Sequence, residues 1–407
     1  MASPGKVISL LYAARSVRGF GDGFAAIILP AYLIAIGFNP FQIGLVAALA
    51  LLGSALLTLA IGYVGSRYDL RSLLLGCAVL MVVTGVAIPA FRNFILIALV
   101  AFIGTINPTI GDIGVHVPLE HAALAQRATD RDRTRIFARY SLVGALAVAA
   151  GSLMAAAPDL LAHLSVEKIT ALQFMFYLYA MLGLVSAALY MYLPRENKQQ
   201  GTSPAPALGR SRSIVYKLAA LFSLDSFAGG FTVQSLLALW LFKYFDLSLA
   251  AASTFFFWSN LLSALSYPVS ARLGERFGLL NATVLTHMAS SVCLIVAAFS
   301  SNLTVVLALL LVRSAFSQMD VPTRTSYVMA IVTPAERTAT ASITAVPRSL
   351  ASAVSPALSG ALLSTSFAAL PLLVCGVLKI VYDLSLFFSF RHIKPPEEKP
   401  ATERARS

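Results

Sequence analysis

Twelve apolar runs, each long enough to cross a bilayer, constrain the fold of this chain more than any other sequence feature. The hydrocarbon core of a membrane is about 30 Å thick, and a helix needs about 20 residues to cross it. Of the 407 residues, 58% are hydrophobic and only 12% are charged. This composition excludes a soluble enzyme, a disordered chain and a disulfide-stapled secreted domain, and it predicts a polytopic membrane protein. The runs lie at about 10–36, 41–64, 71–91, 94–122, 134–157, 170–193, 214–242, 248–271, 279–299, 303–330, 338–363 and 367–390.

A polar segment divides these runs into two sets of six. It reads PRENKQQGTSPAPALGRSRS, and its polar, proline-rich and basic composition is typical of a flexible linker. We therefore predict four parts of the chain: an N-terminal six-helix bundle over 1–193, a cytoplasmic linker over 194–213, a C-terminal six-helix bundle over 214–390 and a charged cytoplasmic tail over 391–407.

The distribution of lysine and arginine predicts the orientation. With the N-terminus inside, the inner segments contain 21 of the 30 basic residues, and the outer loops contain only Arg92, Lys168 and Lys243. Basic residues concentrate on the cytoplasmic side of membrane proteins. We therefore expect a multi-pass protein of the plasma (inner) membrane with both termini in the cytoplasm. The net charge of +12 reflects this topology, and the scatter of basic residues over many loops argues against a nucleic-acid partner.

The two halves are related in sequence. Residues 116–134 read HVPLEHAALAQRATDRDRT, and residues 320–338 read DVPTRTSYVMAIVTPAERT. Both segments have Val-Pro at the second and third positions and end in Arg-Thr. The first span of each half also contains the pattern Phe-x-x-Gly-Phe, which starts at Phe20 and again at Phe227. A parallel duplication of six spans implies a pseudo-two-fold axis along the membrane normal.

The loop after the second span resembles a family motif. Residues 62–71 read GYVGSRYDLR, and the equivalent loop of the second half contains ERFG over 275–278. The pattern is similar to Gly-x-Leu-Ala-Asp-Arg-x-Gly-Arg-Arg of the major facilitator superfamily of secondary transporters, with Ser66 in place of the aspartate. This resemblance, which extends over essentially the whole chain, implies an all-α integral membrane fold. It implies 12 transmembrane helices in two pseudo-symmetric six-helix bundles, with spans 1, 4, 7 and 10 around a central cavity.

Charged side chains within the spans are the candidate binding residues. An ionisable group inside a bilayer costs several kcal/mol unless it is paired or faces water. In span 4, Asp112, His116 and Glu120 are spaced i, i+4 and i+8, so they share one helical face. Each group could also belong to a buried structural ion pair. The predicted substrate- and ion-binding residues are Arg18, Asp22, Asp112, His116, Asp225, Arg313, Asp320 and Arg348.

A second set of charges is predicted to form an inner gate. The ungapped repeat equates Glu120 with Arg324, which places opposite charges at equal depth on opposite sides of the central path. Such a pair can attract when the inner side closes and separate into water when it opens. The alternative is that each residue pairs within its own half. The family-type loops extend the predicted gate to Arg67, Glu275 and Arg276.

Three further groups in the second half are expected to be structural. Lys379 and Asp383 are spaced i, i+4 in the last span, so we expect them to pair with each other. His287 stands alone in its span and is expected to pack against its neighbours.

No enzyme motif is found, and the absence of Gly-x-x-x-x-Gly-Lys-Ser/Thr argues against ATP as the energy source. We expect no enzymatic activity and no cofactor. The leading hypothesis is a monomeric secondary active transporter that moves a small organic solute across the bilayer by alternating access, coupled to protons and in the direction of efflux. One alternative is a metal-cation transporter that uses Asp22, Asp112, His116 and Asp225 as ligands. The other is a non-transporting receptor or lipid-handling protein on the same scaffold.

Overall fold

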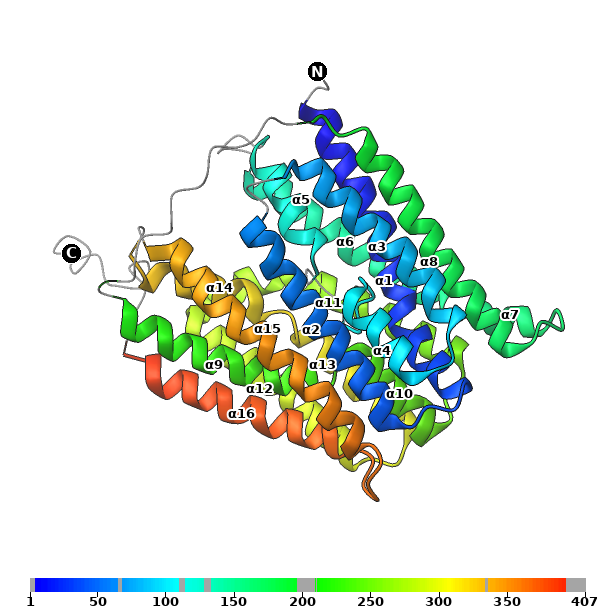
Figure 1. The fold of residues 1–407 in the computed structure, drawn as a ribbon. Helices are drawn as coiled ribbons and strands as arrows, with labels where there is room; N and C mark the ends of the chain where they lie inside the picture. The colour runs from blue at the N-terminus through cyan, green and yellow to red at the C-terminus, as the bar shows by residue number, and fades with distance from the viewer. Residues whose placement is uncertain are drawn as a thin grey trace. The chain divides into compact units, whose positions relative to one another are not determined.

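The computed structural model describes residues 4–64, 68–109, 114–127, 133–195, 209, 211–333 and 336–392. In these ranges all regular secondary structure is helical, as expected from the sequence (Figure 1). The helices are α1 (Pro4–Ala35), α2 (Pro40–Val64), α3 (Leu70–Ala90), α4 (Phe94–Ile103), α5 (His116–Ala125), α6 (Arg133–Met154), α7 (Ala157–Ala162), α8 (Lys168–Met191), α9 (Arg212–Gly230), α10 (Gln234–Phe245), α11 (Leu249–Phe277), α12 (Leu279–Phe299), α13 (Leu303–Phe316), α14 (Asp320–Ile331), α15 (Arg337–Leu362) and α16 (Leu370–Phe390).

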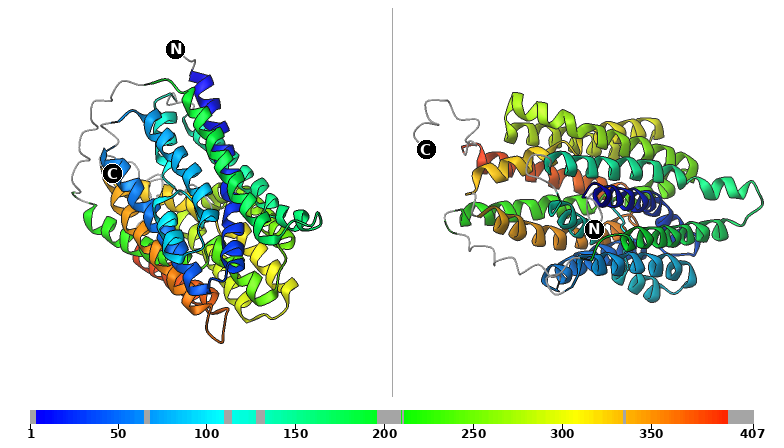
Figure 2. Two further views of the ribbon diagram at one scale, coloured as in Figure 1. Left: turned by 45° about the vertical axis from the view of Figure 1, so that its right-hand side comes forward. Right: turned by 90° about the horizontal axis from the view of Figure 1, so that it is seen from above.

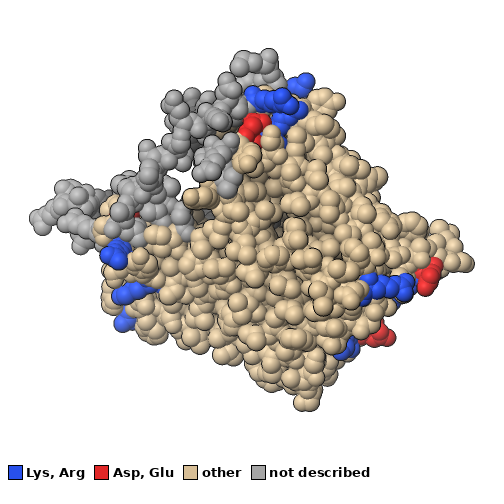
Figure 3. All heavy atoms as spheres, viewed as in Figure 1, with Lys and Arg blue, Asp and Glu red and all other residues tan. Residues whose placement is uncertain are grey.

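Nine spans in the described part of the chain are long and apolar enough to cross a membrane. The other three predicted spans correspond to the short apolar helices α4 and α13, each followed by a second short helix, and to α15, which is long but rich in serine and threonine. On the face drawn in Figure 3, charged side chains gather at the margins, and wide areas between them are uncharged. Such a surface suits contact with lipid.

The spans predicted to be continuous at 94–122 and 303–330 are each broken into two helices. The second helix of each, α5 or α14, begins at the first residue of the 19-residue repeat, His116 or Asp320. A proline is the third residue of both helices, where its missing N–H leaves no intrahelical bond unmade. The two repeats therefore interrupt the fourth and tenth spans at equivalent positions.

The break after α4 is held by α3. The backbone N–H of Thr105 donates to Thr84 Oγ1 at 3.3 Å. A Cβ atom at Gly104 would overlap the Thr84 side chain, so only glycine allows this close approach. Gly114 has φ 130°, a conformation that favours glycine, and it turns the chain into α5.

The helices form two compact units. Unit 1 comprises Met1–Gly201, Thr232–Leu261 and Ala353–Ala368, and unit 2 comprises Thr202–Phe231, Leu262–Ser352 and Ala369–Ser407. Unit 1 therefore contains α1 to α8, α10, the first part of α11 and the end of α15. Unit 2 contains α9, α12, α13, α14, α16 and the remaining parts of α11 and α15. The bundle boundaries drawn from the sequence stay a prediction.

In unit 1, α1 packs against α6 and α8, and α3 packs along α8 (Figure 2). The contact of α1 with α6 is very close. A Cβ atom at Gly23 would overlap the backbone of Val148, and one at Gly151 would overlap the backbone of Phe20. Small residues let membrane helices approach in this way, and here they fix the helix that carries Arg18 and Asp22.

Segments of the second half also pack on the N-terminal helices inside unit 1. Asn260 Nδ2 in α11 donates to Ser152 Oγ in α6 at 2.9 Å. The helices α2 and α15 cross at Gly44 and Gly360, where a Cβ atom on either glycine would overlap the backbone of the other helix. These contacts lie toward the ends of the spans that the predicted topology places outside.

In unit 2, α12 packs against α13, α14 and α16, and α9 packs against α16. The apolar core here includes Leu218, Phe222, Tyr327, Leu386 and Phe390. This packing brings together the charged side chains of α9, α12, α14 and α16.

Candidate functional site

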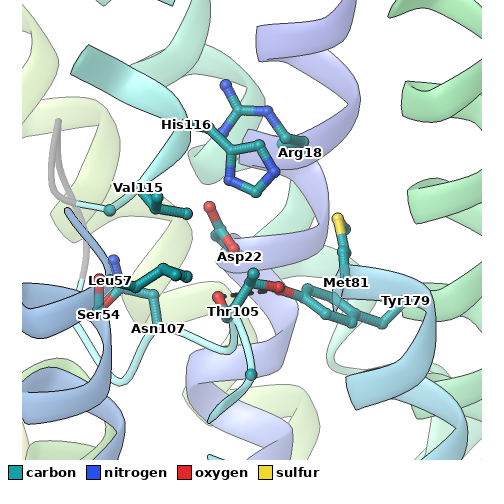
Figure 4. A pocket seen from close by; sticks show the side chains of 12 residues that line it. Arg18, Asp22, Ser54, Leu57, Met81, Thr105, Asn107, Val115, His116 and Tyr179 are labelled. Carbon is teal, nitrogen blue, oxygen red and sulfur yellow. Dashed lines mark hydrogen bonds between the residues drawn. The ribbon is translucent and has the colours of Figure 1, made fainter. Parts of the chain in front are cut away.

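A small cavity in unit 1 is lined by side chains from α1, α2, α3, α5 and α8 and from the segment after α4 (Figure 4). Its space of about 20 Å³ corresponds to one or two water molecules. Asp22, which is half-buried, points its carboxyl group between the His116 ring and the Tyr179 hydroxyl. We call this space the Asp22 cavity. The lining residues are Arg18, Asp22, Ser54, Leu57, Met81, Gly104, Thr105, Asn107, Gly114, Val115, His116 and Tyr179.

Two side chains of the Asp22 cavity have a buried polar atom without a hydrogen-bond partner among the described residues, Thr105 at Oγ1 and His116 at Nε2. The His116 side chain is 6% exposed. A buried nitrogen without a partner costs about 1–3 kcal/mol, so it is expected to bind water or a ligand. Tyr179 on the other side donates its hydroxyl to the Thr105 carbonyl at 3.3 Å. The cavity therefore combines a carboxyl group, an imidazole and a phenol.

Glu120, beside the Asp22 cavity, is fully buried and held by three side chains. Arg18 Nη2 forms an ion pair with it, and the hydroxyls of Tyr140 and Tyr190 donate to its carboxylate, Tyr190 at 2.6 Å. Arg18 Nε also donates to the Tyr190 hydroxyl at 3.1 Å. We call Arg18, Glu120, Tyr140 and Tyr190 the Glu120 cluster. It links α1, α5, α6 and α8.

A second buried acid, Asp225, is held in unit 2 by basic side chains. Arg324 Nη1 donates to Asp225 Oδ2 at 2.9 Å and lies 3.1 Å from Asp320 Oδ2. The Arg324 guanidinium also lies over the Phe222 ring, 5.2 Å from its centroid. Thus three predicted site residues, Asp225, Asp320 and Arg324, contact one another between α9 and α14.

Lys379 and Asp383 do not form the local pair that their spacing predicts. Lys379 Nζ donates to Asp225 Oδ1 at 3.0 Å and lies 2.9 Å from His287 Nε2. His287 Nδ1 lies 2.8 Å from Asp383 Oδ1, so the expectation that this histidine only packs is also wrong. The prediction from the i, i+4 spacing was wrong because Lys379 contacts Asp225 of α9 and Asp383 contacts His287 of α12. We call Asp225, His287, Asp320, Arg324, Lys379 and Asp383 the Asp225 cluster.

Two other predicted residues lie outside these ion pairs. Arg348 Nε in α15 donates to Ser226 Oγ at 3.2 Å, and its guanidinium lies 5.8 Å from the centroid of the Phe222 ring. Arg313 in α13 is half-buried, and it forms no ion pair with a described acid. Its role in binding stays a prediction.

The predicted gate residues are only partly described. Asp112 of the predicted binding site and Arg67 of the gate lie outside the described residues, as does the side chain of Glu275. Arg276 is exposed near the end of α11, 5.6 Å from the centroid of the Phe277 ring. Glu120 and Arg324 each have partners inside their own unit, and their attraction across the path stays a prediction.

An acid outside the spans anchors the start of α9. Glu336 Oε1 accepts hydrogen bonds from the backbone N–H groups of Gly209, at 2.5 Å, and Ser211, at 3.4 Å. The Thr333 hydroxyl donates to Oε2 at 2.6 Å. Hydrogen bonds from the Ser211 and Thr333 side chains, with those backbone donors, lower the pKa of Glu336 to about 2.

The sequence reasoning missed five members of the two clusters: Tyr140, Tyr190, His287, Lys379 and Asp383. One signal could have found them, because a hydroxyl, imidazole or ammonium inside an apolar span has to find a polar partner. Which partner it finds depends on the packing of helices far apart in sequence.

Metal ligands are not grouped in the described part of the chain. Among these residues no group of three or more His, Cys, Asp and Glu side chains is placed to hold a metal ion. The alternative of a metal-cation pathway uses Asp22, Asp112, His116 and Asp225, and because Asp112 lies outside the described residues it stays a prediction.

Comparison with known families decides the class of the protein. The Major Facilitator Superfamily pattern matches residues 11–224 and again 218–406, so each half of the chain matches it once. The chain belongs to the Major Facilitator Superfamily. It is a multi-pass membrane protein and a secondary transporter of small molecules, and it is not an enzyme.

Relatives of this superfamily member cover almost its full length. The uncharacterized membrane protein YJR124C of Saccharomyces cerevisiae is 24% identical over 420 residues, which cover 94% of each chain. A bacterial homolog of the human lysosomal transporter Spinster is 13% identical, with a TM-score of 0.71 and coverage of 95% of this chain and 97% of that one.

Two further solved structures are similar in fold. The nucleoside transporter NupG is 14% identical, with a TM-score of 0.73 and coverage of 94% and 100%. The human organic anion transporter MFSD10 is 17% identical, with a TM-score of 0.63 and coverage of 95% and 100%. Identities this low show a shared fold and leave the solute to be argued from the site.

Proposed function

We propose that this superfamily member exchanges protons for a small organic solute at the Asp22 cavity. The observation that supports this most strongly is a half-buried carboxyl group facing a buried imidazole nitrogen that has no described partner. A carboxylate in such a place can bind a proton or a donor group of a solute. The cavity in this conformation admits only water, so the solute enters when the surrounding helices separate.

Competition for one carboxyl group sets the direction that we propose. A proton and a solute cannot occupy Asp22 together, so the arrival of one releases the other. On the outer side a proton replaces the solute, and on the inner side a solute replaces the proton. An inward proton gradient then drives solute export. The solute that suits this exchange carries a cationic or hydrogen-bond-donor group toward Asp22 and a polar group toward His116 Nε2.

Alternating access requires contacts that can close and open one end of the path. The crossing of α2 and α15 at Gly44 and Gly360, together with the Asn260–Ser152 hydrogen bond, supports a closed outer end. We propose that these contacts separate when the solute is released. We propose that the transporter works as a monomer.

The proposed location is the plasma (inner) membrane, with both termini in the cytoplasm. The support is the split of basic residues, 21 on the inner side against three in the outer loops. Single cysteines near Arg92, near Lys168 and at position 201 test it, in a background without the three native cysteines. An impermeant maleimide should label the first two in intact cells and leave position 201 unlabelled. The reverse pattern would overturn the orientation.

Transport is tested in two steps. A thermal-shift screen of the purified protein against metabolites, drugs and metal ions selects solutes that stabilise the folded protein by binding. Each selected solute is then followed into and out of proteoliposomes, with and without a pH gradient. Movement that accelerates with a gradient supports the proposal. If every stabilising solute crosses these membranes no faster than it crosses protein-free liposomes, a receptor or lipid-handling protein is favoured instead.

A further inference from the structure

His287 lies at the centre of three helices of unit 2 and contacts three charged groups. Its Nδ1 is 2.8 Å from Asp383 Oδ1 on α16. Its Nε2 is 2.9 Å from Lys379 Nζ on α16 and 3.4 Å from Asp225 Oδ1 on α9. The imidazole is 3% exposed, so bulk water does not replace these partners.

Donor and acceptor chemistry fixes where the protons lie. A lysine ammonium only donates, so the nitrogen that it contacts has to accept. His287 Nε2 therefore carries no proton while Lys379 is charged, and Nδ1 carries the proton and donates to Asp383. The ring is then neutral, with its proton on Nδ1.

Other charges of the neighbouring helices surround this arrangement. On α14, Arg324 contacts both Asp225 and Asp320. The guanidinium groups of Arg324 and of Arg348 on α15 both lie over the Phe222 ring. The Tyr382 ring on α16 stands edge-on to the imidazole, with centroids 5.7 Å apart. Arg313 on α13 acts on Lys379 as a like charge. Three carboxylates, of Asp225, Asp320 and Asp383, thus lie among the basic side chains of Arg324, Arg348 and Lys379.

We propose that His287 is a second proton-binding site of the transporter, and that Lys379 and the bound proton exclude each other there. An incoming proton binds Nε2, and the ammonium leaves Nε2 because two positive charges cannot remain 2.9 Å apart. Lys379 keeps its own protons and loses its contact with Asp225 Oδ1. The imidazolium then lies between two carboxylates, Asp383 at 2.8 Å and Asp225 at 3.4 Å.

Loading this site changes the packing of unit 2. With Lys379 on Asp225, α16 is linked to α9, and both contact α12 through His287. With the proton on His287, the direct link from Lys379 to α9 is broken, and the imidazolium joins α12 to both other helices. The use of this switch in transport rests on the proposed function, whereas the proton site itself does not.

Nitrogen-15 NMR of histidine in the purified full-length protein tests the site directly. The chain has five histidines, and His287→Gln identifies the signal of interest. At pH 7 the wild-type ring should be neutral with the proton on Nδ1. In Lys379→Met it should be an imidazolium at the same pH, because Nε2 is freed beside two carboxylates. The matched control is Lys217→Met, which removes an exposed lysine of α9 and should change nothing.

Two results would overturn the proposal: an imidazolium at His287 in the wild type at pH 7, or a neutral ring in Lys379→Met down to pH 5. If Lys379→Met does not fold, the wild type is titrated from pH 7 to pH 5. Loss of the neutral His287 signal in that range supports the site, and its persistence at pH 5 contradicts it.

Transport in proteoliposomes separates this inference from the proposed function. His287→Gln should lower the number of protons that move with each solute and leave solute counterflow intact, whereas His392→Gln, at an exposed histidine, should leave both unchanged. An unchanged ratio in His287→Gln contradicts the inference alone. A wild type that moves solute without protons contradicts the proposed function, and the NMR result then decides the site by itself.

Discussion

The Glu120 cluster and the Asp225 cluster contain the same ion pair with its charges exchanged. Arg18 stands 207 positions before Asp225, which is the offset between the first spans of the two halves, and Glu120 stands 204 positions before Arg324. In unit 1 the base lies on the first span and the acid on the fourth. In unit 2 the acid lies on the first span and the base on the fourth. Both halves therefore have an ion pair between the first and the fourth span, and the acid and the base have exchanged places between the halves.

The side chains around the two pairs differ in what they can titrate. Glu120 is bound by an arginine and two tyrosines, which ordinarily keep their protons near neutral pH. Asp225 is bound by Arg324 and Lys379 and lies near a histidine, whose charge ordinarily changes near neutral pH. The comparison teaches that one copy serves as a permanent link, while the other is placed to respond to protons.

Removal of the acid from the permanent link should have the largest effect on stability. Glu120→Gln leaves the Arg18 guanidinium buried without its counter-charge, which costs about 3–5 kcal/mol in comparable buried pairs. The double variant Arg18→Glu with Glu120→Arg gives unit 1 the polarity of unit 2 and should recover part of the loss. Thermal unfolding of the purified protein measures both.

The matched control is Glu167→Gln, which changes an exposed glutamate before α8 and should leave the unfolding temperature unchanged. If Glu120→Gln unfolds at the wild-type temperature, the pair is not the link between α1 and α5. If the double variant unfolds at no higher temperature than Glu120→Gln, the exchanged ion pair does not stabilise unit 1, and the proposed equivalence of the two clusters is contradicted.

Loss of a tyrosine hydroxyl should have a smaller effect on the same cluster. Tyr190→Phe removes the bond to Glu120 and leaves Arg18 Nε without its acceptor, at a cost of about 1–3 kcal/mol. Tyr192→Phe, at an exposed position two residues later, is the control. Equal unfolding temperatures for the two variants would show that the hydroxyl adds nothing to the link.

The smallest effect is expected outside the spans, at Glu336. Its folded-state pKa of about 2 is below the ordinary value of 4.5, so its charged form stabilises the folded state. This contribution is complete above pH 4.5 and is lost as the pH falls toward 2. Glu336→Gln should therefore lower the unfolding temperature at pH 7, and the difference from wild type should shrink at pH 3. A difference that is equal at both pH values would contradict the assignment.

Much of the fold could be predicted from the sequence, because each span has to satisfy its own backbone in lipid and therefore reads as a long apolar run. The breaks in the fourth and tenth spans were missed. Apolar residues lie on both sides of each break, so hydropathy alone favours one continuous span. Hydropathy also cannot predict a tertiary hydrogen bond such as that from the Thr105 backbone N–H to Thr84 Oγ1.

The candidate residues could be predicted as a set, since an ionisable group in a span is costly, but their pairing could not. Spacing along one helix suggested that Lys379 pairs with Asp383, whereas both are held by residues of other helices. The repeat did equate Glu120 with Arg324, but it does not specify that tyrosines surround one and acids the other. Those partners depend on helix rotation and depth, which a single sequence leaves open.

The central claim is that Asp22 exchanges a proton for the solute, and paired flux measurements test it most directly. Proteoliposomes with a trapped pH indicator and a solute selected by thermal shift report both movements at once, for the wild type, Asp22→Asn and the exposed control Asp246→Asn. We expect solute to drive opposite proton movement in the wild type and the control, and Asp22→Asn to lose it while solute counterflow survives. Proton movement that is equal in Asp22→Asn and the wild type would contradict the account.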